Sequence, residues 1–145
     1  MDRLEIKIIS EKVDKQYEKH AEIRINDRPI IDILREFELP LAKKENSENI
    51  AGAYMYLSPK SLYQNLTKNE NFNEEGKATI LACECGSEGC WPMLVKIKED
   101  EKAIIWEDFE QPHRTIERGN HWDYQSFGIY IFDLYEYKKQ LKSLT

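Results

Sequence analysis

The ten residues from Cys83 to Pro92 constrain the fold more than any other stretch of the chain. They hold all three cysteines and two of the six glycines. An apolar run precedes them at 78–82, and a second apolar run follows at 93–97. Each run has the length of a β-strand, and a short segment that contains glycine is typical of the turn between paired strands. The sequence therefore predicts a hairpin with the cysteines at its turn.

The strands of this hairpin differ in pattern. Residues 78–83 are apolar on both faces, as in an interior strand that is covered on each side. In the second strand, apolar residues alternate with Lys96 and Lys98, so one face is expected to be exposed. After a short acidic turn, residues 102–106 return as a third strand. The block is therefore predicted to be a three-stranded antiparallel meander.

Apolar periodicity and helix-start residues predict the remaining elements. Apolar residues alternate at 4–8 and again at 21–25, which predicts two strands joined by the polar connection 11–20. Further predicted elements are a helix from residue 30 that Pro40 ends, a short strand at 53–57, a helix from Ser58, a strand at 127–132 and a helix from Asp133. Strands arranged in hairpins indicate an α+β fold, with one domain over 1–145, an antiparallel sheet of about six strands and about three helices packed on it.

Charge and composition limit the classes of function. The chain has 145 residues and a formal net charge of −6 at pH 7. An acidic chain has no general attraction for phosphate backbones or anionic membranes, so neither nucleic acid nor membrane is expected as a partner. No apolar run approaches the length of about 18 residues that a membrane helix needs, and the first residues lack the apolar core of a signal peptide. These features predict a cytoplasmic protein.

The cysteine turn has four interpretations. In a hairpin, Cys85 and Cys90 would lie nearly opposite each other, and Cys83 would lie on the same face as Cys85. A zinc ion held by these three thiolates would need a fourth ligand, for which His113 is the best candidate and His121 the second. The alternatives are buried free thiols that act as small apolar side chains, a redox-active pair, and a catalytic nucleophile.

The segment from Trp106 to Tyr124 places aromatic residues beside a histidine and an arginine. Trp, Tyr and Arg are frequent at the energetic centres of binding sites. The imidazole of His113 can transfer a proton near neutral pH, and the guanidinium of Arg114 can bind an anion. The predicted binding residues are Trp106, Phe109, Gln111, His113, Arg114, Trp122 and Tyr124. The alternative is that the aromatic residues fill the core and that Arg114 pairs with Asp108 or Glu110.

Three motifs lie in the C-terminal half of the chain. They are Cys83-x-Cys85-Gly86-x-x-Gly89-Cys90-Trp91-Pro92, Phe109-x-Gln111-Pro112-His113-Arg114 and Trp122-x-Tyr124-x-x-Phe127-Gly128-x-x-x-Phe132-Asp133. Together with a weaker similarity at 25–38, they resemble a family of small uncharacterised bacterial proteins. The resemblance implies a bacterial single-domain protein, and no established activity comes with it.

Two functional hypotheses follow. The first is a cytoplasmic binding or interaction protein whose contact site is the surface from Trp106 to Tyr124 beside the cysteine turn. Its partner would be a protein that it regulates or neutralises, or a small anionic ligand. The second is a zinc-dependent or thiol enzyme that uses the three cysteines and His113, with Arg114 binding an anion. The sequence leaves the oligomeric state and the choice between these hypotheses open.

Overall fold

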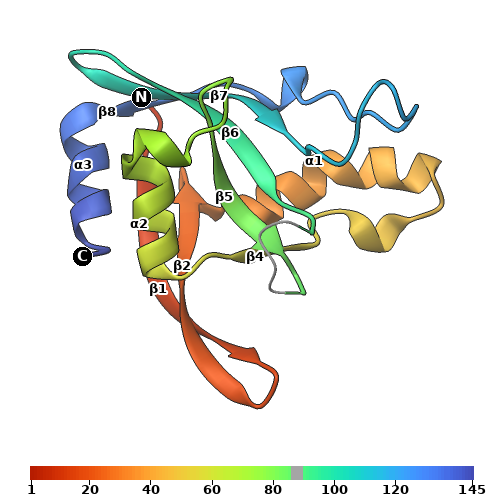
Figure 1. The fold of residues 1–145 in the computed structure, drawn as a ribbon, viewed down its shortest axis with the longest axis horizontal. Coiled ribbons are helices and arrows are strands. Elements are labelled where there is room, and N and C mark those ends of the chain that lie inside the picture. The colour runs from red at the N-terminus through yellow and green to blue at the C-terminus, as the bar shows by residue number, and fades with distance from the viewer. Residues whose placement is uncertain (86–89) are drawn as a thin grey trace.

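The computed structural model describes residues 1–85 and 90–145, which form an α+β fold (Figure 1). Within these residues there are two antiparallel sheets, one of three strands and one of five, and three α-helices. The predicted fold class is confirmed. The predicted single sheet is replaced by two, because the N-terminal hairpin pairs with a short third strand of its own.

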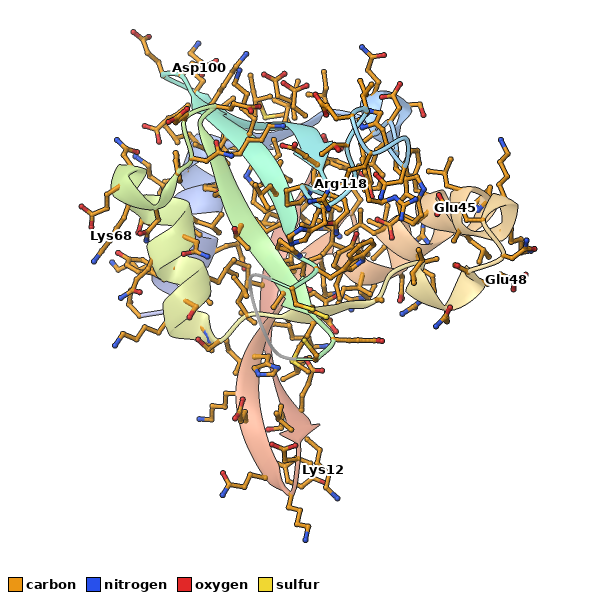
Figure 2. The ribbon with its side chains drawn as sticks, turned by 45° about the vertical axis from the view of Figure 1, so that its right-hand side comes forward. Lys12, Glu45, Glu48, Lys68, Asp100 and Arg118 are labelled. Carbon is orange, nitrogen blue, oxygen red and sulfur yellow. The ribbon has the colours of Figure 1, made fainter. Side chains whose placement is uncertain are left out.

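The N-terminal sheet is built around a long hairpin. Its strands are β1 (Leu4–Val13), β2 (Gln16–Ile25) and β3 (Arg28–Pro29). The prediction of a polar connection at 11–20 is wrong, because strand pairing continues outward to Val13 opposite Gln16, past the end of the apolar alternation. A tight turn with Asp14 at a φ of 58° closes the hairpin. Its outer half projects from the body of the molecule (Figure 1), and Figure 2 shows Lys12 near the tip.

Helix α1 (Ile30–Lys44) packs against β2. The prediction that Pro40 ends this helix is wrong, because the helix continues for another turn. Proline inside a helix costs about 3 kcal/mol, since it cannot donate a backbone hydrogen bond and its ring crowds the preceding turn. Ala42 in the final turn is completely buried and Glu38 is buried one turn before it, so burial on both sides of the proline opposes this cost.

The second sheet carries the predicted meander. Its strands, in spatial order, are β4 (Tyr54–Tyr56), β5 (Lys77–Cys83), β6 (Met93–Glu99), β7 (Ala103–Glu110) and β8 (Tyr130–Asp133). All neighbouring strands are antiparallel, and β5, β6 and β7 are the three strands expected from the sequence. Strand β7 extends beyond its predicted end through an irregularity in its pairing with β6, where Asp108 adopts a φ of 51°.

The other two α-helices begin at the residues that the sequence indicated. They are α2 (Pro59–Thr67) and α3 (Leu134–Lys142), and the short 3₁₀ helices are η1 (Glu48–Ile50), η2 (Asn69–Asn71) and η3 (Gln125–Phe127). Ser58 Oγ accepts the backbone N–H of Ser61 at 3.2 Å. Asp133 Oδ2 accepts the backbone N–H of Glu136 at 2.9 Å. Both contacts are side-chain N-caps that satisfy a free N–H of the first helical turn.

The core contains the largest aromatic side chains of the meander. Trp106 is completely buried, with its ring edge-on to those of Phe132 and Tyr137. Its indole N–H donates to the Tyr137 hydroxyl at 3.2 Å, so the polar atom of this core residue is satisfied. None of the helices in the described part of the chain combines the length and the apolar character needed to cross a membrane.

Candidate metal centre

Cys83, Cys85 and Cys90 come together at the end of strand β5. Their sulfur atoms all lie within 4.8 Å of one another. Cys83 is the last residue of β5 and pairs with Tyr54 of β4, which fixes its backbone. The backbone N–H of Cys85 donates to Cys83 Sγ at 3.4 Å. The expected clustering of the three thiols is confirmed, and three thiols this close together can hold a metal ion.

The three thiols differ in environment. Cys83 is buried, whereas Cys85 and Cys90 are exposed. Burial raises the pKa of the Cys83 thiol to about 11, and the two neighbouring thiols add to this effect. Cys83 therefore carries a proton at neutral pH, and a metal ion must displace that proton to bind the sulfur as a thiolate. The predicted glycine turn at 86–89 lies outside the described residues.

His113, the predicted fourth ligand, does not join the three sulfurs. Among residues 1–85 and 90–145, the group of ligand atoms within 4.8 Å consists of the three cysteines alone. The backbone N–H of His113 donates to Gln111 Oε1 at 3.2 Å, and the backbone N–H of Arg114 donates to the Gln111 carbonyl at 3.0 Å. This turn buries Arg114 and leaves His113 half-buried. The second candidate, His121, lines a separate cavity.

The cysteine cluster is nevertheless connected to the segment that contains His113. The side-chain amide of Gln111 donates to the carbonyl of Pro92 at 2.9 Å, two residues beyond Cys90. The guanidinium carbon of Arg114 lies 6.0 Å from the centre of the Trp91 ring. The two sequence segments that were singled out as candidate sites therefore lie against each other.

Arg114 belongs to a buried cation–aromatic cluster. Its guanidinium lies 4.0 Å from the centre of the Trp122 ring and pairs with the Glu45 carboxylate. The same carboxylate oxygen accepts the indole N–H of Trp122 at 2.8 Å. The interaction with Arg114 holds the pKa of Glu45 below its usual range. The predicted partners of Arg114, Asp108 and Glu110, are replaced by Glu45, the C-cap residue of α1, which is far away in sequence.

The location of Glu45 explains why sequence patterns did not reveal this pair. Glu45 caps the C-terminal end of α1, where a negative charge is disfavoured by the helix dipole. The favourable contacts come from Arg114 and Trp122 in the loop after β7. Figure 2 shows Glu45 at the end of α1, on the same side of the molecule as Arg118 of that loop. The pair therefore fastens the loop to the helix.

Glu38 forms the centre of a second buried polar cluster that the sequence did not indicate. Its Oε1 accepts the backbone N–H of Gly52 at 2.9 Å. Its Oε2 accepts the hydroxyls of Tyr54 and Tyr124, each at 2.6 Å. Burial raises the pKa of Glu38, although the three donors and Arg114 act in the opposite direction. One local signal marks Glu38: it lies four residues after Leu34, on the apolar face of α1, whereas Glu36, the other glutamate of this helix, is exposed. Its three donors come from distant segments and have no local signal.

Most of the predicted binding residues are buried. Exposure is below a tenth for Trp106, Phe109, Gln111, Arg114, Trp122 and Tyr124, so a protein partner cannot rest directly on most of their surface. All of these except Trp106 line one cavity of about 550 Å³, which the structure forms beside the 121–129 segment. The structure thus brings these residues together, but largely as the walls of a depression. The regulation or neutralisation of a protein partner stays a prediction.

A smaller cavity of about 310 Å³ lies beside the cysteine cluster. It is lined by Cys85 and by His20, a buried residue at the base of the projecting hairpin. His20 Nδ1 lies 3.1 Å from Glu11 Oε1, and its Nε2 lies 3.4 Å from Glu18 Oε2. Both ring nitrogens therefore face carboxylates of the hairpin, which gives the buried imidazole a local structural role.

The resemblance to a bacterial protein family rests on the three motifs and stays a prediction. In comparisons with known proteins, no family model matches the chain, and neither the curated proteins nor the solved structures give a significant match to it.

Proposed function

We propose that this chain is a zinc-binding protein, that Cys83, Cys85 and Cys90 bind the metal as thiolates, and that water takes the fourth position of the tetrahedron. The observation that supports this proposal is the distance of at most 4.8 Å between each pair of sulfurs. A tetrahedral zinc ion with bonds of about 2.3 Å to sulfur requires sulfurs about 3.8 Å apart. Small side-chain rotations at the two exposed cysteines are enough to reach that spacing.

The environment of the thiols favours metal binding over nucleophilic catalysis. A thiol nucleophile needs a lowered pKa, which a neighbouring cation or a helix N-terminus supplies. Cys83 has a raised pKa instead, and the acidic residue Glu84 lies beside the cluster in sequence. A divalent cation removes this difficulty, because it stabilises thiolates directly and releases their protons.

The exposure of Cys85 and Cys90 also argues against the alternative that all three cysteines are buried free thiols with a packing role only. A free cysteine that serves only as a small apolar side chain is normally buried. Here one cysteine is buried and two are exposed. Cys85 and Cys90 face solvent next to the buried sulfur of Cys83, so these two exposed thiols can bind a metal ion from solution.

A bound metal would connect two parts of the fold. It would tie the end of β5 to residue 90, and Trp91 and Pro92 follow directly with their contacts to Arg114 and Gln111. Binding free energy at a site formed by folding contributes to stability. The metal would thereby hold the 111–114 turn in place, which gives it a structural role in a binding protein.

Metal analysis of the purified protein tests this proposal. We expect close to one zinc per chain after expression without added metal, and loss of that zinc in Cys85→Ser. Glu84→Gln is the matched control, because it changes an exposed residue beside the cluster and keeps all three sulfurs. The metal-free protein should also bind Co²⁺ with thiolate-to-cobalt charge-transfer absorption that Cys85→Ser weakens.

Two results would refute a zinc site. One is the absence of both zinc in the purified protein and charge-transfer absorption on cobalt addition. The other is equal zinc content in Cys85→Ser and in the parent protein. Titration of the metal-free protein with a thiol reagent then separates the alternatives, since a single fast-reacting cysteine indicates thiol chemistry and slow labelling of all three indicates structural thiols.

A further inference from the structure

A groove with a volume of about 540 Å³ lies between helices α2 and α3 and shares no residue with the metal centre. Figure 1 shows the two helices next to each other on one side of the second sheet. Their facing walls and the sheet below supply the apolar lining, which consists of Tyr63, Leu66, Ile97, Ile104, Tyr137 and Leu141. A volume of this size falls within the range of about 300–1,000 Å³ that small-molecule sites occupy.

The groove lies between the helices because the buried side chains of each helix pack under that helix and do not fill the space between the two helices. Helix α2 buries Leu62 and Leu66, and helix α3 buries Tyr137 and Leu141. Phe72, which follows η2, adds an aromatic ring to the lining. An apolar space flanked by two helices suits a small molecule better than a partner helix, whose diameter with side chains is about 10 Å.

The charges along the groove are opposite to those of the protein as a whole. The chain has a net charge of −6, but the charged side chains that line the groove are Lys138, Lys142 and Glu99. Lys138 Nζ lies 3.7 Å from Glu99 Oε2. The side chain of Lys142 makes no ion pair within the described part of the chain. An anionic group of a ligand at this position could therefore form an ion pair with the Lys142 ammonium.

We propose that this groove binds a single-chain anionic amphiphile, of which a medium-chain carboxylic acid is the simplest example. The apolar chain lies on Ile97 and Ile104 between the helices, where it removes apolar surface from water. The carboxylate lies at Lys142. This ligand class combines the two properties of the groove, an apolar interior and an unpaired cation in its lining.

Titration of the full chain with decanoate, followed by amide chemical shifts, tests the proposal. We expect saturable shifts confined to α2, α3 and the facing parts of β6 and β7. Lys142→Glu should weaken decanoate binding by about tenfold or more, because it replaces an attraction by a repulsion at short range. Lys139→Glu is the matched control, since it makes the same charge change in the last turn of α3 at a position that does not line the groove. Its effect should stay within about twofold.

Two further measurements separate the apolar and ionic contributions. Decanol should bind the parent protein more weakly than decanoate and should be insensitive to Lys142→Glu. Thr67→Trp, at an exposed position that lines the groove, should block both ligands by filling the space. The proposal is overturned if decanoate does not saturate, if its shifts map elsewhere, if both lysine variants weaken it equally, or if Thr67→Trp binds normally. Metal removal should leave this binding unchanged, so its outcome is independent of the zinc site.

Discussion

Replacing Glu38 with glutamine tests the buried hydrogen-bond cluster that joins α1 to β4 and to the 121–129 segment. Glutamine has nearly the same shape as glutamate, so the change leaves no cavity. Its amide oxygen can still accept the N–H of Gly52. Its NH₂ group, however, replaces the oxygen that accepts the hydroxyls of both Tyr54 and Tyr124. The two buried hydroxyls thus lose the acceptor of their hydrogens, and the NH₂ group can only donate to their oxygens.

The structure gives the size of this effect. A buried donor that loses its acceptor costs about 1–3 kcal/mol, so two such donors cost about 2–5 kcal/mol. That loss is a large part of the 5–15 kcal/mol by which a domain is typically stable. Urea unfolding followed by tryptophan fluorescence measures it, with an unchanged m-value indicating that the two unfolding reactions are comparable.

A double-mutant cycle isolates the contacts themselves. In the parent protein, Tyr124→Phe removes a hydrogen bond to a carboxyl group and should cost about 1–3 kcal/mol. In the Glu38→Gln background the same change removes a hydroxyl that has already lost its carboxyl acceptor and keeps only its interaction with Tyr54, so it should cost clearly less than in the parent protein. A coupling energy below about 0.5 kcal/mol would mean that the two sites are independent, and the reasoning would be refuted.

The same variant has a defined pH dependence. Burial raises the pKa of Glu38 above its ordinary value of 4.5. The folded state therefore gains stability when this carboxyl is protonated, and that gain is complete below pH 4.5 and lost as the pH rises through the folded pKa. Glutamine does not titrate, so the difference in unfolding free energy between the parent and Glu38→Gln should widen as the pH falls from neutrality. A difference that stays constant or shrinks would contradict the assignment.

Three other predictions concern the metal centre, the Arg114 cluster and a close backbone approach. Competition with a chelator of known affinity measures the apparent zinc affinity at each pH. This affinity should fall by at least about tenfold per pH unit on acidification, because Cys83 with its pKa of about 11 must release a proton to bind zinc. An affinity independent of pH would exclude Cys83 as a ligand. Glu45→Gln should lower the unfolding free energy by about 1–2 kcal/mol, because it leaves the buried guanidinium of Arg114 without its anion. The cost is limited because the Glu45 carboxylate is partly exposed to water. An unchanged urea midpoint would show that the pair contributes nothing to stability. Gly52→Ala should destabilise the fold more than Gly119→Ala. Both glycines have a positive φ, but a Cβ at Gly52 would lie 2.6 Å from a side-chain carbon of α1, whereas a Cβ at Gly119 would have no atom within 4 Å. Equal decreases in melting temperature would refute the steric argument.

Local patterns were sufficient to predict the elements whose residues decide their own conformation. The meander followed from a continuous apolar run at 78–83, alternation in the next strand and the short acidic turn after it. The starts of α2 and α3 followed from Ser58 and Asp133, whose side chains cap the helices as expected. The clustering of the cysteines also followed from the predicted hairpin, although the pairing of β5 with β6 ends at Leu81 opposite Met93, so that Cys85 and Cys90 lie outside the paired strands.

Predictions failed where distant contacts outweigh local preference. Pro40 is a strong local signal for a helix end, but packing around Ala42 and Glu38 carries α1 beyond it. The donors to Glu38 and the partner of Glu45 could not be found, because they lie in other segments of the chain. Only the burial of Glu38 has a local signal, which is its position four residues after Leu34 on the apolar face of α1. His113 was expected at the metal for its chemistry alone, and the turn at 111–114 determines that Arg114 is the residue buried there.

The projecting β1–β2 hairpin has a consequence for how the chain can vary. The apolar core reaches Ala21 on β2, with Ile9 of β1 packed against it, and the strands beyond them pair residue for residue up to the turn at Asp14. Removing two residues from each strand near the tip would therefore shorten the arm while every remaining side chain keeps its partner and its face, because side chains alternate between the faces with a period of two. The length of this arm should therefore have little effect on the free energy of unfolding of the rest of the fold. The backbone amides of its outer half should exchange their hydrogens with solvent by local fraying, much faster than by global unfolding.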